Sequence, residues 1–271
     1  MKTPILAALV AACPALQGAS LVHYYSFESD FNDAVGSANG TAGAEVGTAT
    51  GNGFDGGNAA SFPGTLSGGG AFGPAGYVSL SPNVPTLSGA FSFSFWARLN
   101  IDASTNPRGV FDFSGDGGDG PQSLYIQNGP NANKLAFRVD GLGTGNAVAF
   151  SDVPEDGSWF SVIANFDPSG NLDVYIDGTL DGSVPVTGFT SASWSADQYL
   201  GAFNVNSTAP ARGLDGELDD FAIYDGLLTS AEIVGLSSGN LSPTAIPEPS
   251  AGILALLGMA LGVCRTENTR R

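Results

Sequence analysis

Turn-forming residues interrupt this sequence so often that a helical bundle or a coiled coil is excluded. The 271-residue chain contains 39 glycines and 16 prolines, which lie between short apolar runs. Glycine and proline end helices and strands, so this spacing favours many short strands joined by turns. Hydrophobic residues make up 42% of the chain, which is enough to fill a sizeable core. We therefore predict an all-β fold.

The charge balance limits the partners of the chain. It carries 26 acidic and 9 basic residues, which gives a formal net charge of −17. A nucleic-acid-binding protein needs clustered lysine and arginine to meet the phosphates, so nucleic acid is excluded as a partner. The negative charge also repels anionic polymers and lipid surfaces unless divalent cations intervene.

The run from Phe91 to Trp96 alternates phenylalanine and serine before its final tryptophan. An alternation with period two is typical of a strand with one buried face, so Phe91, Phe93 and Phe95 are expected to point inward. Trp96 then falls on the opposite face, where a loop or the second sheet has to cover it.

Residues 159–180 predict a three-stranded antiparallel meander. The apolar runs 159–166 and 172–176 are separated by Asp-Pro-Ser-Gly, which is typical of a type I turn, and Asp177-Gly178 is a two-residue hairpin signal. Residues 214–224 predict a late strand. Thr229 and Glu232 after it have the spacing of a capping box, which predicts one short helix near 230–236.

The first 20 residues are typical of a secretory signal peptide. Lys2 precedes an apolar stretch over 5–12, and small residues follow at 18–20. Val10–Cys13 is also similar to a bacterial lipobox, which leaves lipidation of Cys13 as an alternative. The other cysteine is Cys264, so the exported domain is expected to contain no disulfide and no thiolate metal site.

The last residues combine a short apolar segment with arginines. Residues 251–264 would form about 21 Å of helix, which is shorter than the hydrocarbon core of a bilayer. Pro247, Glu248 and Pro249 before it, and the arginines after it, resemble the PEP-CTERM sorting signal of bacterial exported proteins. This resemblance implies recognition of Pro247, Glu248 and Pro249 by an exosortase-type processing enzyme, after transient anchoring of the helix in the inner membrane. A plain C-terminal membrane anchor is the alternative.

Several segments in a fixed order resemble the laminin-G-like, or concanavalin-A-like, jelly roll. They are Tyr24–Glu28, Phe93–Trp96, Trp159–Val162 with Tyr175–Gly178, Gly216–Tyr224, and Leu228–Ile233. The resemblance implies a sandwich of two antiparallel sheets with adjacent first and last strands. It divides the chain into a signal peptide (1–20), the jelly-roll domain (21–237), a linker (238–246) and the sorting segment (247–271).

The residues offer little for catalysis. His23 is the single histidine and lies in the expected first strand, so a serine–histidine–aspartate triad or a histidine zinc site is not expected. Laminarinase-type enzymes of this fold carry Glu-x-Asp-x-x-Glu on one strand. Here Glu217 and Asp219 match the first two acids, but Ala222 replaces the second glutamate. We therefore predict a protein that is not an enzyme.

A calcium ion often bridges the opening segment and the last strand in relatives of this fold. Pairing of the terminal strands would bring the acids of both segments together as calcium ligands: Glu28, Asp30, Asp33, Asp219 and Asp220. The alternative is that these acids face solvent and cap turns.

Aromatic rings in turn-rich sequence are candidates for sugar contacts, because a flat ring matches the C–H face of a pyranose. Trp194 and Tyr199 are the predicted ligand-binding residues, with core packing as the alternative for Trp194. The sequence thus predicts an exported cell-surface or matrix protein that binds polysaccharide. A structural matrix protein without a specific ligand and a glycan-active enzyme are the alternatives, because the fold alone does not decide function.

Overall fold

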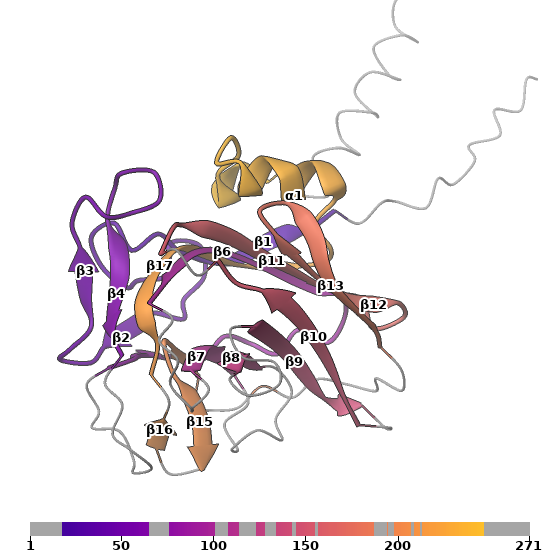
Figure 1. Ribbon diagram of the computed structural model, residues 1–271, viewed down its shortest axis with the longest axis horizontal. Coiled ribbons are helices and arrows are strands. Elements are labelled where there is room, and N and C mark those ends of the chain that lie inside the picture. The colour runs from indigo at the N-terminus through magenta and orange to yellow at the C-terminus, as the bar shows by residue number, and fades with distance from the viewer. Residues whose placement is uncertain are drawn as a thin grey trace, which may run out of the picture.

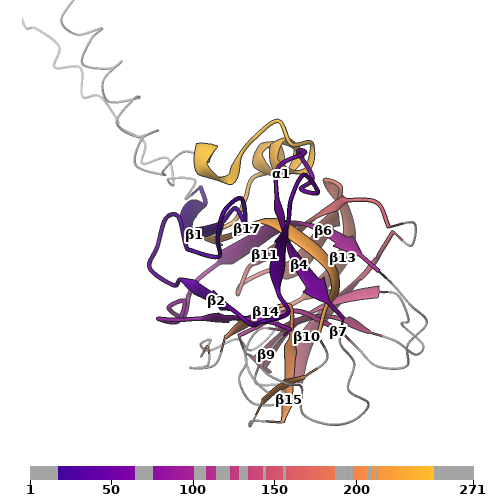
Figure 2. The same cartoon turned by 90° about the vertical axis from the view of Figure 1, so that its left-hand side faces the viewer.

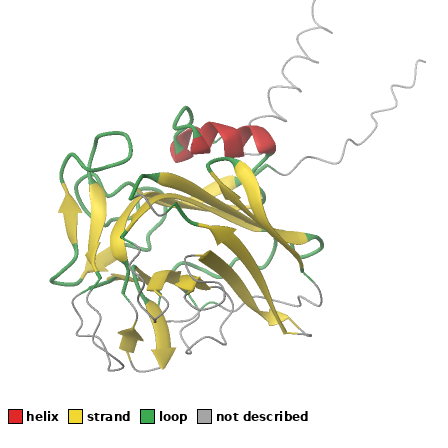
Figure 3. Cartoon of the chain, in the orientation of Figure 1, coloured by secondary structure: helices red, strands yellow, loops and turns green. Residues whose placement is uncertain are grey.

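Two antiparallel sheets stack face to face, and a short helix lies on the outer side of one of them (Figure 1). Figure 3 shows that strands form both layers. The predicted antiparallel β-sandwich with a short helix is therefore confirmed for the part of the chain that is described. The computed structural model describes residues 18–64, 76–100, 108–113, 123–127, 134–142, 145–154, 157–186, 194, 198–206, 209–211 and 213–246.

The first sheet has eight strands within these ranges. The last strand of the sandwich lies inside it rather than at an edge (Figure 2). The predicted pairing of the first and last strands is confirmed, because β1 (Ser20–Tyr25) pairs with β17 (Asp215–Asp225). The order across the sheet is β13 (Thr179–Pro185), β12 (Asn171–Ile176), β11 (Phe160–Phe166), β6 (Phe91–Leu99), β17, β4 (Ala59–Pro63) and β3 (Gly47–Ala49).

The second sheet has seven strands within the described ranges and closes the other side of the core. A separate hairpin is formed by β15 (Phe203–Asn206) and β16 (Ala209–Ala211). The order across the sheet is β10 (Gly145–Asp152), β9 (Lys134–Leu142), β8 (Ser123–Gln127), β7 (Arg108–Asp112), β14 (Tyr199–Leu200), β5 (Val78–Leu80) and β2 (Gly40–Ala42).

The alternation in β6 sets which side chains enter the main core. Phe91, Phe93 and Phe95 are at most 2% exposed and pack between the sheets, as the period-two pattern predicts. Trp96 is half-buried on the other face. A loop covers it, because the ring of Phe54 stacks on the ring of Trp96 with centroids 3.9 Å apart.

The predicted meander is confirmed in β11, β12 and β13, which pair in antiparallel order. Asp177 and Gly178 form the tight turn between β12 and β13. Both residues have positive φ angles, +48° and +76°, as a two-residue hairpin turn of this kind requires.

The predicted helix is α1 (Ser230–Ser237), and its capping box is present. The Glu232 backbone N–H donates to Thr229 Oγ1 at 3.3 Å, and the Thr229 backbone N–H donates to Glu232 Oε2 at 2.7 Å. The helix packs on the outer face of the first sheet. A second, smaller core forms there from Ala19, Ile163, Ala222, Tyr224, Leu228, Ile233, Leu236 and Ile246.

The strand β17 changes its partner partway along its length. Residues 215–218 pair with β4 and residues 221–225 pair with β1, while β6 follows the opposite edge of β17. At the change, Asp220 has a φ angle of +49°, and the register with β6 shifts between Asp219 and Ala222. We call this place, defined by Asp219 and Asp220, the fork of β17. It leaves room for the loop of residues 52–58 beside the two carboxylates.

The ends of the described structure belong to the fold. Ala19 is fully buried and Ser20 begins β1. The residues expected as a linker, 238–246, contain the short helix η1 (Pro243–Ala245), and Ile246 is buried in the second core. Within the described ranges, no helix combines the length and the apolar character that crossing a membrane requires.

The two terminal segments lie outside the described residues. They include residues 1–17 of the predicted signal peptide, Cys13, and the sorting segment with Pro247, Glu248 and Pro249. The signal peptide and the sorting signal therefore stay predictions from the sequence.

Candidate functional site

A pocket of about 310 Å³ lies beside the fork, between the outer face of the first sheet and the segment that follows α1. This size falls at the lower end of the range for small-ligand sites. We call it the fork pocket. It is lined by Ser94, Phe95, Trp96, Ser161 and Ile163 from the sheet, by Tyr24, Glu28, Phe54, Asp55 and Asp220 around the fork, and by Leu236, Gly239, Leu241, Ser242 and Pro243.

Backbone N–H groups hold one carboxylate of the fork, and a tyrosine hydroxyl holds the other. The Asp220 backbone N–H donates to Asp219 Oδ1 at 2.9 Å. Asp219 is 2% exposed, and its Oδ2 accepts the backbone N–H of Phe54 at 3.0 Å. Asp220 accepts a hydrogen bond from the hydroxyl of Tyr24 on β1. These contacts fix the loop of Phe54 and the first strand to the same point of β17.

Two further carboxylates come from loops. Glu28 lies between β1 and β2, and Asp55 lies between β3 and β4. The carboxylate of Glu28 accepts the backbone N–H of Asn58, with Oε2 at 3.1 Å and Oε1 at 3.3 Å. Asp55 Oδ1 accepts the backbone N–H of Gly57 at 2.7 Å. Both side chains line the fork pocket, which therefore has a strongly acidic wall.

Burial and mutual repulsion disfavour ionisation of the fork carboxylates. Burial raises the pKa of Asp219 to about 7, and the nearby charges of Asp220 and Asp55 add to this rise. The hydrogen bonds from the backbone N–H groups of Phe54 and Asp220 lower the pKa and offset part of the rise. Burial also raises the pKa of Asp220, while the hydrogen bond from Tyr24 lowers it. Asp219 therefore holds its proton at pH values where an ordinary aspartate is ionised.

We expect the stability of the domain to fall as the pH rises from about 4 to about 7. The folded state holds the Asp219 proton more tightly than the unfolded state, so this stabilisation is full below the unfolded pKa and is lost as the pH rises through about 7. A change in pKa from 3.8 to about 7 corresponds to at most about 4 kcal/mol. Solvent screening reduces it to about 2 kcal/mol, or about 4–8 °C in thermal unfolding.

The variant Asp219→Asn separates this effect from the repulsion within an acidic protein, whose net charge also grows with pH. Its melting temperature should depend less on pH than that of the wild type, because the amide does not titrate. Equal pH slopes for the variant and the wild type would show that Asp219 contributes nothing to the pH dependence.

Aromatic rings form the apolar part of the pocket. The rings of Phe54 and Trp96 are nearly parallel, with an angle of 5° between their planes. Gly239, at the end of α1, closes on this pair with a φ angle of +69°, and a Cβ atom there would lie 2.9 Å from the Phe54 ring. A larger residue at position 239 would therefore displace the aromatic wall.

The sheet contributes two serines to the pocket floor. Ser94 Oγ lies 3.0 Å from the hydroxyl of Tyr224, so its hydrogen bond is satisfied. Ser161 is 3% exposed, and its Oγ has no hydrogen-bond partner. An unpaired buried hydroxyl is costly, and Ser161 is one of the residues that line the pocket.

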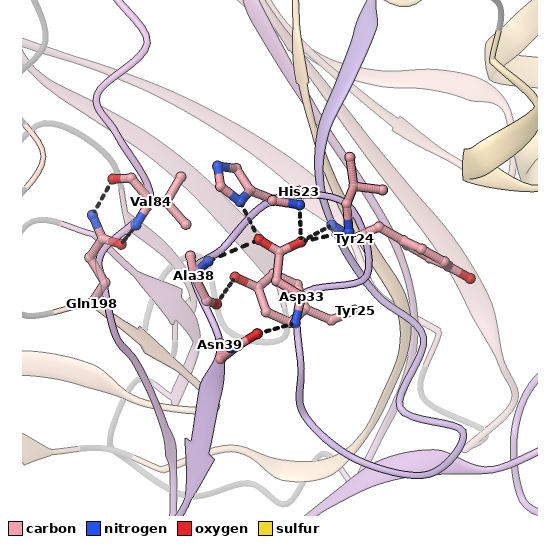
Figure 4. A network of polar contacts seen from close by, with 10 residues as sticks. His23, Tyr24, Tyr25, Asp33, Ala38, Asn39, Val84 and Gln198 are labelled. Atoms are coloured by element: carbon pink, nitrogen blue, oxygen red, sulfur yellow. Dashed lines mark hydrogen bonds and ion pairs between the residues drawn. The ribbon is translucent and has the colours of Figure 1, made fainter.

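Asp33, a predicted calcium ligand, is instead the centre of a buried hydrogen-bond network (Figure 4). His23 Nδ1 lies 2.6 Å from Asp33 Oδ2, and backbone N–H groups of Tyr24, Val35, Gly36 and Ala38 donate to the same carboxylate. Although burial opposes ionisation, these donors hold the pKa of Asp33 at about 2. The network joins β1 to the loop that follows it.

The structure brings together only part of the predicted calcium set. Asp219 and Asp220 lie at the fork, and Glu28 lines the same pocket, but Asp30 is exposed and hydrogen-bonds to Asn32. Within the described ranges, no group of three or more acidic, histidine or cysteine side chains is arranged to hold a metal ion. The arrangement thus lacks the converging oxygens that calcium prefers.

Calcium binding stays a prediction that thermal unfolding can test. An ion that binds only the folded domain would raise its melting temperature, whereas identical curves in calcium and in EDTA would contradict the prediction.

The two predicted ligand-binding aromatics lie away from the fork pocket. Trp194 is 8% exposed and packs in the main core, with its ring 5.2 Å from Phe113 and 6.0 Å from Phe91 between centroids. Trp194 thus takes the core position that the sequence left as its alternative. Tyr199 is half-buried on β14 with its ring 5.0 Å from that of Tyr77, and its contact with a ligand stays a prediction.

Several pocket residues were not singled out from the sequence. Phe54 and Asp55 lie in a loop of glycines and polar residues with no recognisable motif, and Ser161 is a small polar residue in an apolar strand. Trp96 did carry a signal, because the alternation in β6 placed it on the outer face, and Glu28 and Asp220 were singled out as acids of the predicted calcium set.

The order of the strands and the central position of β17 define a sandwich of the concanavalin-A-like class. The model of the concanavalin A-like lectin/glucanases superfamily, Laminin_G_3, matches residues 72–234, which is more than half of the chain. The chain therefore belongs to this family. No curated protein matches it significantly.

Solved structures agree with this fold. Domain 4 of AbnA, an extracellular arabinanase from Geobacillus stearothermophilus solved with arabinotriose, is 22% identical, with a TM-score of 0.59 over 81% of this chain and 99% of that one. The binding domain of botulinum neurotoxin serotype D/C is 17% identical, with a TM-score of 0.65 over 82% of this chain. The same toxin domain was solved with SialylT, at 16% identity and a TM-score of 0.61, with 82% of this chain and 51% of that chain covered. This chain spans about half the length of the toxin domain, 52% in the first of these comparisons.

Proposed function

We propose that this chain is an exported bacterial domain that binds polysaccharide in an adhesion or matrix role. The observation that carries the proposal is the fork pocket, where aromatic rings, carboxylates and an unpaired hydroxyl meet. Sugars present C–H faces to aromatic rings and hydroxyl groups to carboxylates, so this combination suits an oligosaccharide. Membership of a family of lectins and glucanases, and the likeness to a domain solved with arabinotriose, support it.

The proposed location rests on the terminal sequences. The signal-peptide pattern of residues 1–20 would direct export. Pro247, Glu248 and Pro249, followed by the apolar segment 251–264, would allow transient anchoring in the inner membrane and recognition by an exosortase-type enzyme. The domain would then act at the cell surface or in the extracellular matrix.

The arrangement of the acidic residues favours binding without catalysis. Glycoside hydrolysis needs one carboxyl group as acid and another as nucleophile or base. Glu217, which matches the first acid of the enzyme motif, is instead hydrogen-bonded to Arg98 through both of its oxygens, at 3.0 and 3.1 Å. Ala222 occupies the position of the second glutamate of that motif.

Replacing Trp96 with alanine should weaken glycan binding by about tenfold or more, because the aromatic wall of the pocket would be lost. The measurement is binding of the exported protein to a polysaccharide array, followed by titration of the best oligosaccharide. Trp159→Ala is the control, because Trp159 is a half-buried tryptophan directly before β11 that does not line the pocket.

Thermal unfolding of both variants separates lost binding from lost folding. Equal weakening by the two substitutions, or none by Trp96→Ala, would place the glycan elsewhere. Absence of binding to every glycan would favour a structural matrix role without a specific ligand.

A further inference from the structure

Within the described ranges, the carboxylates of the fork pocket have no basic partner. Among the residues that the structure describes, ion pairs join His23 to Asp33, Arg98 to Glu217, Arg108 to Asp215 and Lys134 to Asp152. None of them involves Glu28, Asp55 or Asp220, the carboxylates that line the pocket. The pocket wall therefore presents negative charge that no neighbouring cation of the described protein offsets. A ligand with a positive charge would be drawn to it.

Ser161 is a second and independent sign of a ligand at this place. Its neighbours Phe160 and Val162 point into the main core, so the alternation of β11 turns the Ser161 side chain to the outer face. Ser161 lines the fork pocket and is only 3% exposed, and its buried Oγ has no hydrogen-bond partner. A hydrogen-bonding group of a ligand would satisfy this hydroxyl.

The geometry favours an organic cation over a metal ion. Calcium needs six to eight oxygens that converge on one point. Here Asp219, Asp55 and Glu28 each turn an oxygen to a different backbone N–H, and no metal-like group of three acids is present in the described ranges. A primary ammonium group needs only two or three acceptors in separate directions, and it also interacts well with aromatic faces such as that of Trp96.

We propose that the fork pocket selects saccharides that carry a protonated amine, such as units of an amino-sugar polymer, over neutral and acidic saccharides. This inference rests on the proposed function, because it assigns the ligand class of the same pocket. The ammonium group lies against the Glu28 and Asp55 carboxylates, the sugar ring covers the aromatic wall, and one ring hydroxyl meets Ser161 Oγ. An acidic saccharide is repelled by the same carboxylates.

The test compares three oligosaccharides with one backbone and one linkage. Tetramers of β-1,4-linked glucosamine, N-acetylglucosamine and glucose differ only in the group at C2, which is an ammonium, an amide or a hydroxyl. Titration calorimetry with the exported protein, at about pH 5.5 to keep the amine protonated, gives the three affinities. We expect the glucosamine tetramer to bind about tenfold more tightly than the other two, and the difference to shrink at high salt.

Isosteric variants separate the pocket from the net charge of the protein. In the double variant Glu28→Gln/Asp55→Asn the preference for the amine should disappear, since the amides keep the shape without the charge. Asp30→Asn is the control, because Asp30 is an exposed acid near Glu28 that does not line the pocket. It should keep the full preference. The proposal would be overturned if the double variant and Asp30→Asn lost the same amount of affinity for the glucosamine tetramer.

The variant Ser161→Ala separates a role in binding from a role in stability, because its binding and its melting temperature are measured independently. Removing an unpaired buried hydroxyl should leave the melting temperature unchanged or slightly higher, while binding of the glucosamine tetramer weakens about tenfold. Unchanged binding by this variant would remove Ser161 from the site and overturn the proposed contact.

The outcomes distinguish this inference from the broader one. Equal affinity for the three tetramers, lost in Trp96→Ala, would overturn the selection of amines and leave glycan binding in the pocket intact. If the glucose tetramer bound, and only when calcium was present, a metal ion would occupy the position assigned to the ammonium group. That result would overturn the proposal. Failure of these tetramers and of every glycan on the array would overturn both.

Discussion

The variant Asp33→Ala is expected to lose about 3–5 kcal/mol of stability, because it leaves several buried donors without an acceptor. The Asp33 carboxylate accepts from the side chain of His23 and from four backbone N–H groups, and its side chain is fully buried. The melting temperature should fall by about 10 °C or more. Urea unfolding measured in EDTA gives the free energy directly, without a contribution from a bound metal.

Asp30→Ala is the matched control, since Asp30 lies in the same loop and is exposed. It should change stability by less than about 0.5 kcal/mol. If Asp33 acted only as a metal ligand, its replacement would have no effect in EDTA, which would contradict the role assigned to it.

The same carboxylate sets an acid limit on stability. The pKa of Asp33 is about 2 in the folded protein, below the ordinary value of 3.8, so its contribution is present above the unfolded pKa. It is lost as the pH falls through about 2. Because Asp219 acts in the opposite direction, we expect these two groups to place the stability maximum of the wild type near pH 4, where the two ranges meet.

The second large effect is expected for Phe93→Ala, at about 3–5 kcal/mol. Phe93 lies on β6 in the first sheet and is fully buried. Its ring joins the two sheets, because it lies 4.8 Å from the ring of Phe111 on β7 and 5.9 Å from that of Phe137 on β9. The rings of Phe91, Phe113, Trp194 and Phe221 lie within 6.1 Å as well.

Denaturant unfolding with an unchanged slope would assign this loss to stability rather than to a change in the unfolded state. Leu180→Ala serves as the control, because Leu180 is a large apolar residue on β13 that is 52% exposed. A loss below about 1 kcal/mol for Phe93→Ala would mean that the core closes over the cavity far better than such sites generally do.

The parts of the fold that were predicted from the sequence depend on local patterns. The inward phenylalanines of β6 follow from alternation, the turn at Asp177 and Gly178 from its residue types, and the start of α1 from the spacing of Thr229 and Glu232. Each of these signals acts within a few residues, so no knowledge of the tertiary structure is needed.

The site could not be predicted in this way, because it is produced by pairing between distant segments. The acids of the opening segment were expected to act together, but His23 and a ring of backbone N–H groups take Asp33 while Asp30 stays in solvent. The fork depends on the left-handed backbone conformation of Asp220. It also depends on the change of partner along β17, which pairs first with β4 and then with β1. Neither leaves a mark in the sequence that composition or periodicity would show.

The position of β17 has a consequence for how the chain acquires its structure. Its residues, 215–225, come near the end of the sandwich, yet they join β1, β4 and β6 in the middle of the first sheet. During synthesis the earlier strands emerge without the one that connects them, and their pairing across nearly 200 residues has to wait for it. A chain truncated before residue 215 would expose three strand edges at once. We therefore expect the first sheet to stay incomplete until residues 215–225 have been synthesised.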